Sequence, residues 1–171
     1  KAEVSNYQKI AMSSISHLVA QDNGTNTQQL QAQAKDILRN LRFDDAGDTG
    51  YVFVYDLQGV SVAHGVNASL EGKNLYDFKD PNGVYLIREL ISSAKDGGGF
   101  VEYAWKNTQG VVSPKLGYAA LIPKWNWVLG TGFWISGLEQ QVASTETRVN
   151  DAIDNAFVNT IIASILAVAV T

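Results

Sequence analysis

The fold of this chain is decided by one stretch, GYVFVYD at residues 50–56. The stretch is dense in β-branched and aromatic residues, which pack well on a pleated sheet, so it predicts a strand. The turn DLQG at residues 56–59 and the returning stretch VSVAH at residues 60–64 predict its hairpin partner. The centre of the chain is therefore predicted to be built around a β-sheet.

The remaining central segments extend this sheet. A helix is expected to begin at Asp80-Pro81, because Asp can cap a helix and Pro is tolerated in its first turn. It is expected to end at the three glycines of residues 97–99. Three further strands are predicted, at Phe100–Trp105, Leu116–Leu121 and Trp127–Trp134. This order predicts an α+β fold with an antiparallel sheet of about five strands.

The flanks of the chain differ from its centre in composition. Fourteen of the 15 glycines and all three prolines lie within residues 47–137, so few helix breakers remain outside. A long N-terminal helix and a second helix at residues 27–42 are predicted before the sheet, and a C-terminal helix from about residue 137 after it. We therefore divide the chain into a helical arm (1–46), a central core (47–136) and a C-terminal helix (137–171).

The C-terminal segment has two interpretations. A narrow apolar seam suited to helix pairing comes first, followed by residues 155–171, which carry no charge. A membrane-spanning helix needs about 20 apolar residues, so this run fits a transmembrane segment that is cut short. The alternative is a buried terminal helix of a soluble protein. No signal peptide opens the chain, which a removed membrane span before Lys1 would explain.

Composition excludes several classes of function. Seventeen acidic against 13 basic residues give a formal charge of −4, which argues against binding to nucleic acid. The chain has no cysteine, and its two histidines, His17 and His64, lie far apart, so no metal site or cofactor is predicted. No catalytic motif is found, and Asp44 and Asp45 are expected to be solvated turn residues. The chain is not predicted to be an enzyme.

The strands nevertheless carry polar groups that would suit a small carboxylate. A lysine supplies positive charge, whereas histidine and tyrosine supply directed hydrogen bonds. Each residue also has a structural alternative, since sheet tyrosines are mostly core and a lysine after proline is usually exposed. Lys115 and Tyr118 are three positions apart, so the backbone would have to be irregular for them to converge. The candidates are His64, Tyr103, Lys115, Tyr118, Tyr55 and Tyr51.

An ordered series of motifs resembles single-Cache extracytoplasmic sensor domains. It runs from GYVFVYD (50–56) and VAH (62–64) through GKNL (72–75), DPNG (80–83), GGFVEY (98–103) and PKL (114–116) to WVLGTG (127–132). The resemblance implies a PAS-like sheet with a ligand pocket, in the sensor region of a bacterial methyl-accepting chemotaxis protein. A transmembrane histidine kinase is the alternative, because the same module serves both.

The resemblance also implies a ligand, partners and a location. Related domains often bind short organic acids such as acetate, propionate or pyruvate, so His64, Tyr103 and Lys115 become the leading contacts, followed by Tyr118, Tyr55 and Tyr51. Gly117 replaces a commonly larger residue, which is expected to enlarge the pocket. A homodimer through the N-terminal helix, flanking transmembrane helices in the inner membrane and a periplasmic position are expected. An enzyme would instead consume the acid, and a structural module would not respond to it.

Overall fold

We describe residues 2–45, 47–107 and 109–169 from a computed structural model. The helices along the chain are α1 (Ala2–Gln21), α2 (Thr27–Asn40), α3 (Leu86–Lys95) and α4 (Ile135–Ala169), with short 3-10 turns η1 (Ala68–Leu70) and η2 (Pro123–Trp125). The strands are β1 (Arg42–Asp45), β2 (Asp48–Asp56), β3 (Ser61–His64), β4 (Gly99–Lys106), β5 (Val112–Ile122) and β6 (Trp127–Trp134).

The strands form one open antiparallel sheet in the order β1-β2-β6-β5-β4, with β3 also paired to β2. The predicted α+β fold is therefore confirmed. The sheet has six strands where about five were expected, because residues 42–45 pair with residues 48–51 as β1. The sequence of β1 has no apolar alternation and was interpreted as a helix end and a turn.

One face of the sheet is covered by α1 and α2. Val52 and Val54 of β2 and Leu129 of β6 pack there with α1 and α2 residues such as Ile15 and Leu38. Small residues such as Ala11 let α1 approach the sheet closely, so α1 contributes directly to the main core.

The opposite face is covered by α3. Tyr51, Phe53 and Tyr55 alternate with the valines of β2 and point to this side, where they pack against Leu86 and Leu90. The two-residue period of the strands thus separates the face beneath α1 and α2 from the face beneath α3, which we call the aromatic face because Tyr51, Phe53 and Tyr55 lie on it.

The helix that was expected from Asp80 begins instead at Leu86. The Asp80 side chain does accept backbone N–H groups, as a helix cap would, but within a turn, from Asn82 at 2.9 Å and Val84 at 2.8 Å. Its other oxygen accepts the N–H of Ala104 in edge strand β4 at 2.7 Å. Asp80 therefore attaches the loop before α3 to the sheet edge.

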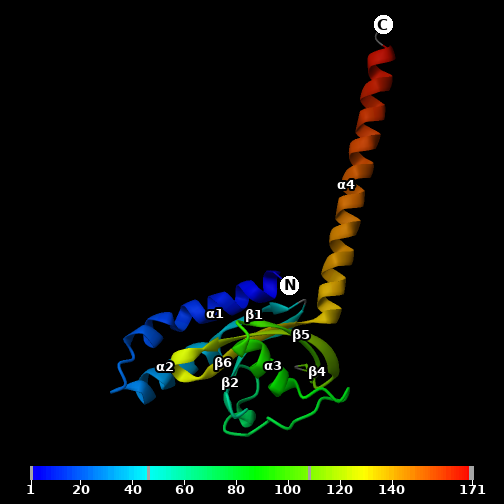
Figure 1. The fold of residues 1–171 in the computed structure, drawn as a ribbon. Coiled ribbons are helices and arrows are strands. Elements are labelled where there is room, and N and C mark those ends of the chain that lie inside the picture. The colour runs from blue at the N-terminus through cyan, green and yellow to red at the C-terminus, as the bar shows by residue number, and fades with distance from the viewer. Residues whose placement is uncertain (1, 46, 108, 170–171) are drawn as a thin grey trace.

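The chain leaves the sheet through α4, which follows β6 without a break and projects away from the rest of the molecule (Figure 1). Its apolar seam is exposed at Val142, Val149, Ile153 and Phe157, by 52–67%. Across the described residues, no helix combines the length and hydropathy of a membrane span. The side chains of residues 159–171, where most of the predicted span falls, lie outside the described part.

Glycines on the two central strands allow the aromatic face to form. Gly117 and Gly132 are paired neighbours on β5 and β6. A Cβ on Gly132 would lie 2.7 Å from the carbonyl oxygen of Leu116, whereas one on Gly117 would lie 2.8 Å from Cε1 of Tyr103. The first contact is with backbone, and the second is with the far end of a side chain.

We predict that Gly132→Ala lowers the free energy of unfolding by about 1–3 kcal/mol, the usual range for overpacking. Gly117→Ala should have a smaller effect, because the Tyr103 ring can shift more readily than a strand backbone. Urea denaturation of the two variants and the wild type measures the difference. Equal stability of Gly132→Ala and wild type would contradict the packing.

Candidate functional site

The candidate site is built on one row of residues that crosses three strands. Tyr103 of β4 is the register partner of Lys115 in β5, and Lys115 is the partner of Trp134 in β6. Paired residues in an antiparallel sheet point to the same face. Strand β5 begins at Val112 rather than Leu116, so Lys115 lies inside a regular strand and its side chain is held on the aromatic face.

Lys115 is fully buried, at 0% exposure. Its Nζ has no hydrogen-bond partner within the part of the chain that the structure describes. The ammonium lies instead over two aromatic rings, 3.8 Å from the ring centre of Tyr51 and 4.5 Å from that of Trp134. Burial lowers the pKa of Lys115 to about 7, although the charges of Asp45 and Asp48 oppose the shift.

His64 packs against the same Tyr51 ring, with the two ring centres 4.8 Å apart. Its Nδ1 accepts the N–H of Asn67 at 3.2 Å, so the neutral ring carries its proton on Nε2. Burial, and then the positive charge of Lys115, lower the pKa of His64 to about 4. At neutral pH His64 is therefore an uncharged donor, and it adds no second cation to the site.

Tyrosines form the walls of a small inner chamber. It is lined by Tyr51, Phe53, Tyr55, His64, Leu86, Leu90, Tyr103 and Trp105. Burial raises the pKa of the phenols of Tyr51, Tyr55 and Tyr103, so all three stay protonated and can donate hydrogen bonds. The chamber volume is about 10 Å³, which is close to the ~10–15 Å³ that a single water molecule needs. A larger molecule can enter only if side chains move.

An outer pocket of about 590 Å³ adjoins the chamber and shares His64 and Trp105 with it. Trp105 lines both spaces and lies between them. Phe78 packs against Trp105 edge to face, with the ring centres 5.5 Å apart. Trp105 and Phe78 therefore form the boundary that a ligand would cross on its way inward.

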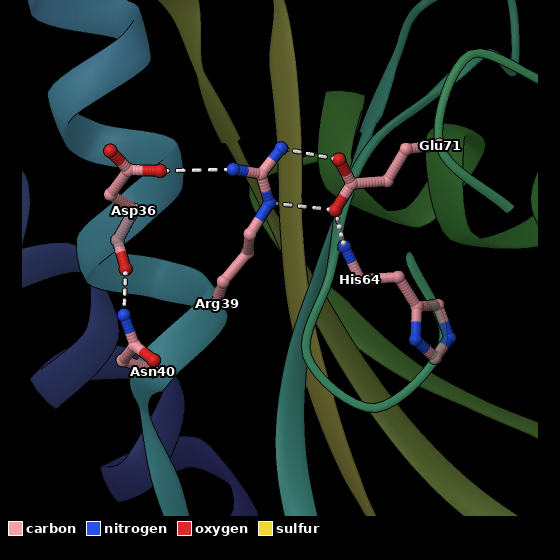
Figure 2. A network of polar contacts seen from close by, with 5 residues as sticks. All are labelled: Asp36, Arg39, Asn40, His64 and Glu71. Carbon is pink, nitrogen blue, oxygen red and sulfur yellow. Dashed lines mark hydrogen bonds and ion pairs between the residues drawn. The ribbon is translucent and has the colours of Figure 1, made fainter. Parts of the chain in front are cut away.

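Figure 2 shows how the loop over this pocket is fixed to α2. Arg39 of α2 donates from Nε to Oε1 of Glu71 at 2.8 Å, and its second nitrogen bonds the other carboxylate oxygen. The same Oε1 of Glu71 accepts the backbone N–H of His64 at 3.1 Å. The Arg39 guanidinium lowers the pKa of the Glu71 carboxyl, which keeps the bridge ionised. His64 is thus held in place through its backbone.

The structure brings five of the six predicted residues together and places Tyr118 elsewhere. His64, Tyr51, Tyr55, Tyr103 and Lys115 share the aromatic face. Tyr118 points to the opposite face, because β5 is a regular strand and the two residues are three positions apart. Its ring packs edge to face on Phe100 at 4.8 Å. Gly117 does not leave open space, because the Tyr103 ring lies over it.

Asp45 is the residue that sequence reasoning missed. It was expected to be a solvated turn residue, yet it is 2% exposed, and Oδ2 accepts the N–H of Trp134 at 3.1 Å. Its neighbour Asp44 is exposed. Only recognition of β1 as a strand, with its alternating faces, would have distinguished the two aspartates.

The arrangement can hold one negative charge. Among the described residues Lys115 is the only buried lysine or arginine, and its ammonium lies over Tyr51, one of the residues that line the chamber. No group of three or more His, Asp or Glu side chains in the described ranges is placed to hold a metal ion. The chemistry of the chamber is that of an anion-binding site with apolar walls.

Two curated bacterial relatives match almost the whole chain. One is the sensor histidine kinase MctS of Rhizobium johnstonii, 34% identical over 92% of this chain. The other is the methyl-accepting chemotaxis protein CtpM of Pseudomonas aeruginosa, 34% identical over 99% of this chain. The chain spans 34% and 29% of the length of these two relatives.

Solved structures agree with these relatives. A methyl-accepting chemotaxis protein from Vibrio parahaemolyticus is 44% identical with a TM-score of 0.69, over 79% of this chain and 88% of that one. A Cache chemosensory domain solved to explain carboxylic acid recognition is 27% identical with a TM-score of 0.69, over 78% and 92%. The sequence model of the family described as single Cache domain 2 matches residues 1–148, so the chain belongs to this family of sensor domains.

Proposed function

We propose that this chain is the extracytoplasmic sensor region of a chemoreceptor and that it binds a short monocarboxylate, such as acetate, propionate or pyruvate, at Lys115. The observation that carries the proposal is the buried ammonium of Lys115, which has no hydrogen-bond partner among the described residues and lies over the rings of Tyr51 and Trp134. The similarity to a Cache domain that recognises carboxylic acids supports the same ligand class.

The charge of the site favours a monocarboxylate over a dicarboxylate. Lys115 can pair with one carboxylate, whereas His64 is neutral because its pKa is lowered to about 4. A second carboxylate would be buried among phenols and aliphatic side chains without a cation, which is strongly unfavourable. The phenols of Tyr51, Tyr55 and Tyr103 supply hydrogen-bond donors to the carboxylate or to a keto or hydroxyl group of the ligand.

Binding requires the chamber to open. Because its volume is about 10 Å³, the rings of Trp105 and Phe78 must move so that the ligand can pass inward from the outer pocket. The loop that carries Phe78 is fixed on one side by Glu71 and on the other by Asp80, through the contacts with α2 and β4 described above. We infer that the segment between these two anchors moves during ligand entry.

The similarity to MctS supports a second candidate, the sensor region of a histidine kinase. The two candidates share the ligand site and differ in the output of the whole protein. Transfer of phosphate from ATP to a histidine of the whole protein would establish the kinase, and a chemotactic response without that transfer would establish the chemoreceptor.

We also propose that two copies associate side by side and that the protein is anchored in the inner membrane with this region in the periplasm. The exposed apolar residues of α4, from Val142 to Phe157, support helix pairing, as does Ile10 of α1 at 57% exposure. Analytical ultracentrifugation of the chain tests the association, which should weaken when Ile153 and Phe157 are changed to serine.

Replacement of Lys115 tests the binding site directly. Lys115→Met should abolish the rise in melting temperature that propionate, acetate or pyruvate causes in the wild type. It should also raise the free energy of unfolding without ligand, on the order of 1–4 kcal/mol, because it removes a buried charge without an ionic partner. Lys124→Met, at an exposed lysine on η2, is the matched control. An unchanged ligand response in Lys115→Met would refute the proposed site.

The pH dependence of binding follows from the lowered pKa of Lys115. That pKa is about 7 in the free protein, so the ammonium that pairs with the carboxylate is lost as the pH rises through 7. Short organic acids stay ionised in this range. The affinity should therefore fall about tenfold between pH 6 and pH 8. Asp45 also becomes negatively charged as the pH rises, which lowers the affinity for a carboxylate further.

Calorimetric titration with propionate at pH 6, 7 and 8 measures this dependence. Proton uptake on binding should be largest near and above pH 7, and it is detected by repeating the titration in buffers of different ionisation enthalpy. An affinity that is constant from pH 6 to pH 8 would show that Lys115 is not the charge partner.

A further inference from the structure

Three buried polar atoms without hydrogen-bond partners, counting only described residues, belong to residues that meet at the end of β6. They are Oδ1 of Asp45, Nζ of Lys115 and Nε1 of Trp134. Trp134 touches both other residues, because its backbone N–H donates to Oδ2 of Asp45 at 3.1 Å and its ring lies 4.5 Å from Nζ of Lys115. Such orphaned buried groups call for a physical explanation.

The position of Trp134 gives this cluster a direct connection to α4. Trp134 is the last residue of β6, and the next residue, Ile135, begins α4. The hydrogen bond from Trp134 to Asp45 therefore holds the chain at the point where the sheet becomes the helix. Asp45 reaches this point from β1, at the far side of the sheet from β4.

The charges of Asp45 and Lys115 depend on each other. Burial raises the pKa of Asp45 to about 6, the N–H of Trp134 and the charge of Lys115 lower it, and Asp48 and Asp44 raise it. Asp45 in turn favours the charged form of Lys115. The interaction is electrostatic and not a contact ion pair, since no nitrogen–oxygen distance of 4 Å or less joins the two.

We propose that Asp45 is a positioning residue that couples ligand charge at Lys115 to the first turn of α4. The inference rests on the proposed carboxylate site and adds the route by which its occupancy reaches the helix. When a carboxylate pairs with Lys115, its negative charge offsets the ammonium field at Asp45. The ionised form of Asp45 is then less favourable, and Asp45 takes up a proton more readily.

Protonation changes the bond that holds Trp134. An ionised carboxylate accepts a stronger hydrogen bond from an N–H group than a neutral acid does, by roughly a factor of two. Ligand binding therefore weakens the attachment of the β6–α4 junction to β1. The two states differ in how firmly the first turn of α4 is held, which gives the ligand the differential effect that a signal requires.

The first arm of the test needs no ligand. In buffer free of carboxylates, the backbone amide resonance of Trp134 is followed by NMR from pH 4 to pH 9. We expect an inflection near pH 6 that is absent in Asp45→Asn, which keeps an oxygen acceptor but has no charge. In Lys115→Met the midpoint should rise by half a pH unit or more. Asp44→Asn, at the exposed neighbour, is the control: it should keep the inflection, with a midpoint slightly below that of the wild type because the charge of Asp44 raises the pKa of Asp45.

The second arm adds propionate at saturating concentration at pH 6.5. The amides of Trp134 and Ile135 should shift in the wild type, and the shift should fall by at least half in Asp45→Asn while the dissociation constant stays within about threefold. A full shift in Asp45→Asn would overturn the coupling. If Asp45→Asn does not fold, the midpoint change in Lys115→Met decides the first arm.

The two arms separate the possible failures. If no carboxylate binds but the Trp134 amide titrates as expected, the proposed ligand and its coupling are wrong, and the electrostatic link between Asp45 and Lys115 is retained. If carboxylates bind but the Trp134 amide has no inflection that Asp45→Asn removes, the proposed function stands and the role of Asp45 is wrong.

Discussion

The candidate site depends on the burial of one ammonium group, that of Lys115, within the sheet. Removing a charge from water costs several kcal/mol even after relaxation, and the attraction of the Tyr51 and Trp134 rings returns only part of that, about 2 kcal/mol for a well-desolvated contact. Lys115 is therefore held in an unfavourable state by the register of β5 between β4 and β6. An anion that pairs with Lys115 would offset the free-energy cost of burying its charge. This gain would contribute to the affinity for the anion.

The alternation of side chains along each strand keeps this feature apart from the rest of the core. The apolar residues beneath α1 and α2 form a core without titratable groups, whereas the face beneath α3 carries Tyr51, Tyr55, Tyr103, His64 and Lys115. Since the rings of Tyr103 and Phe53 lie over glycines 117 and 130, the aromatic face is dense although its central strands carry few side chains. The proposed ligand site thus lies on the face of the sheet opposite the core beneath α1 and α2.

Sequence patterns predicted the elements that depend on local periodicity. They failed where a contact between residues distant in the chain determines the structure. The hairpin at residues 50–64 was predicted because its alternation is visible in the chain. The start of α3 was placed too early because Asp80 has the chemistry of a helix cap, but it caps a turn and bonds to β4. Tyr118 was grouped with Lys115 although the period of a regular strand separates their faces. The burial of Asp45 depends on pairing with β2 and on Trp134, which composition does not reveal.

The two walls of the chamber differ in how they are held, and this difference gives ligand binding a direction. His64 is fixed to α2 through Glu71 and Arg39, so its backbone resists displacement (Figure 2). Lys115 is instead paired to β6, whose last residue leads directly into α4. If a ligand binds as proposed and draws His64 and Lys115 together, the anchor on the His64 side resists, so we expect the movement in the strands that carry Lys115 and Trp134. The proposed response would then reach α4 rather than α1 and α2.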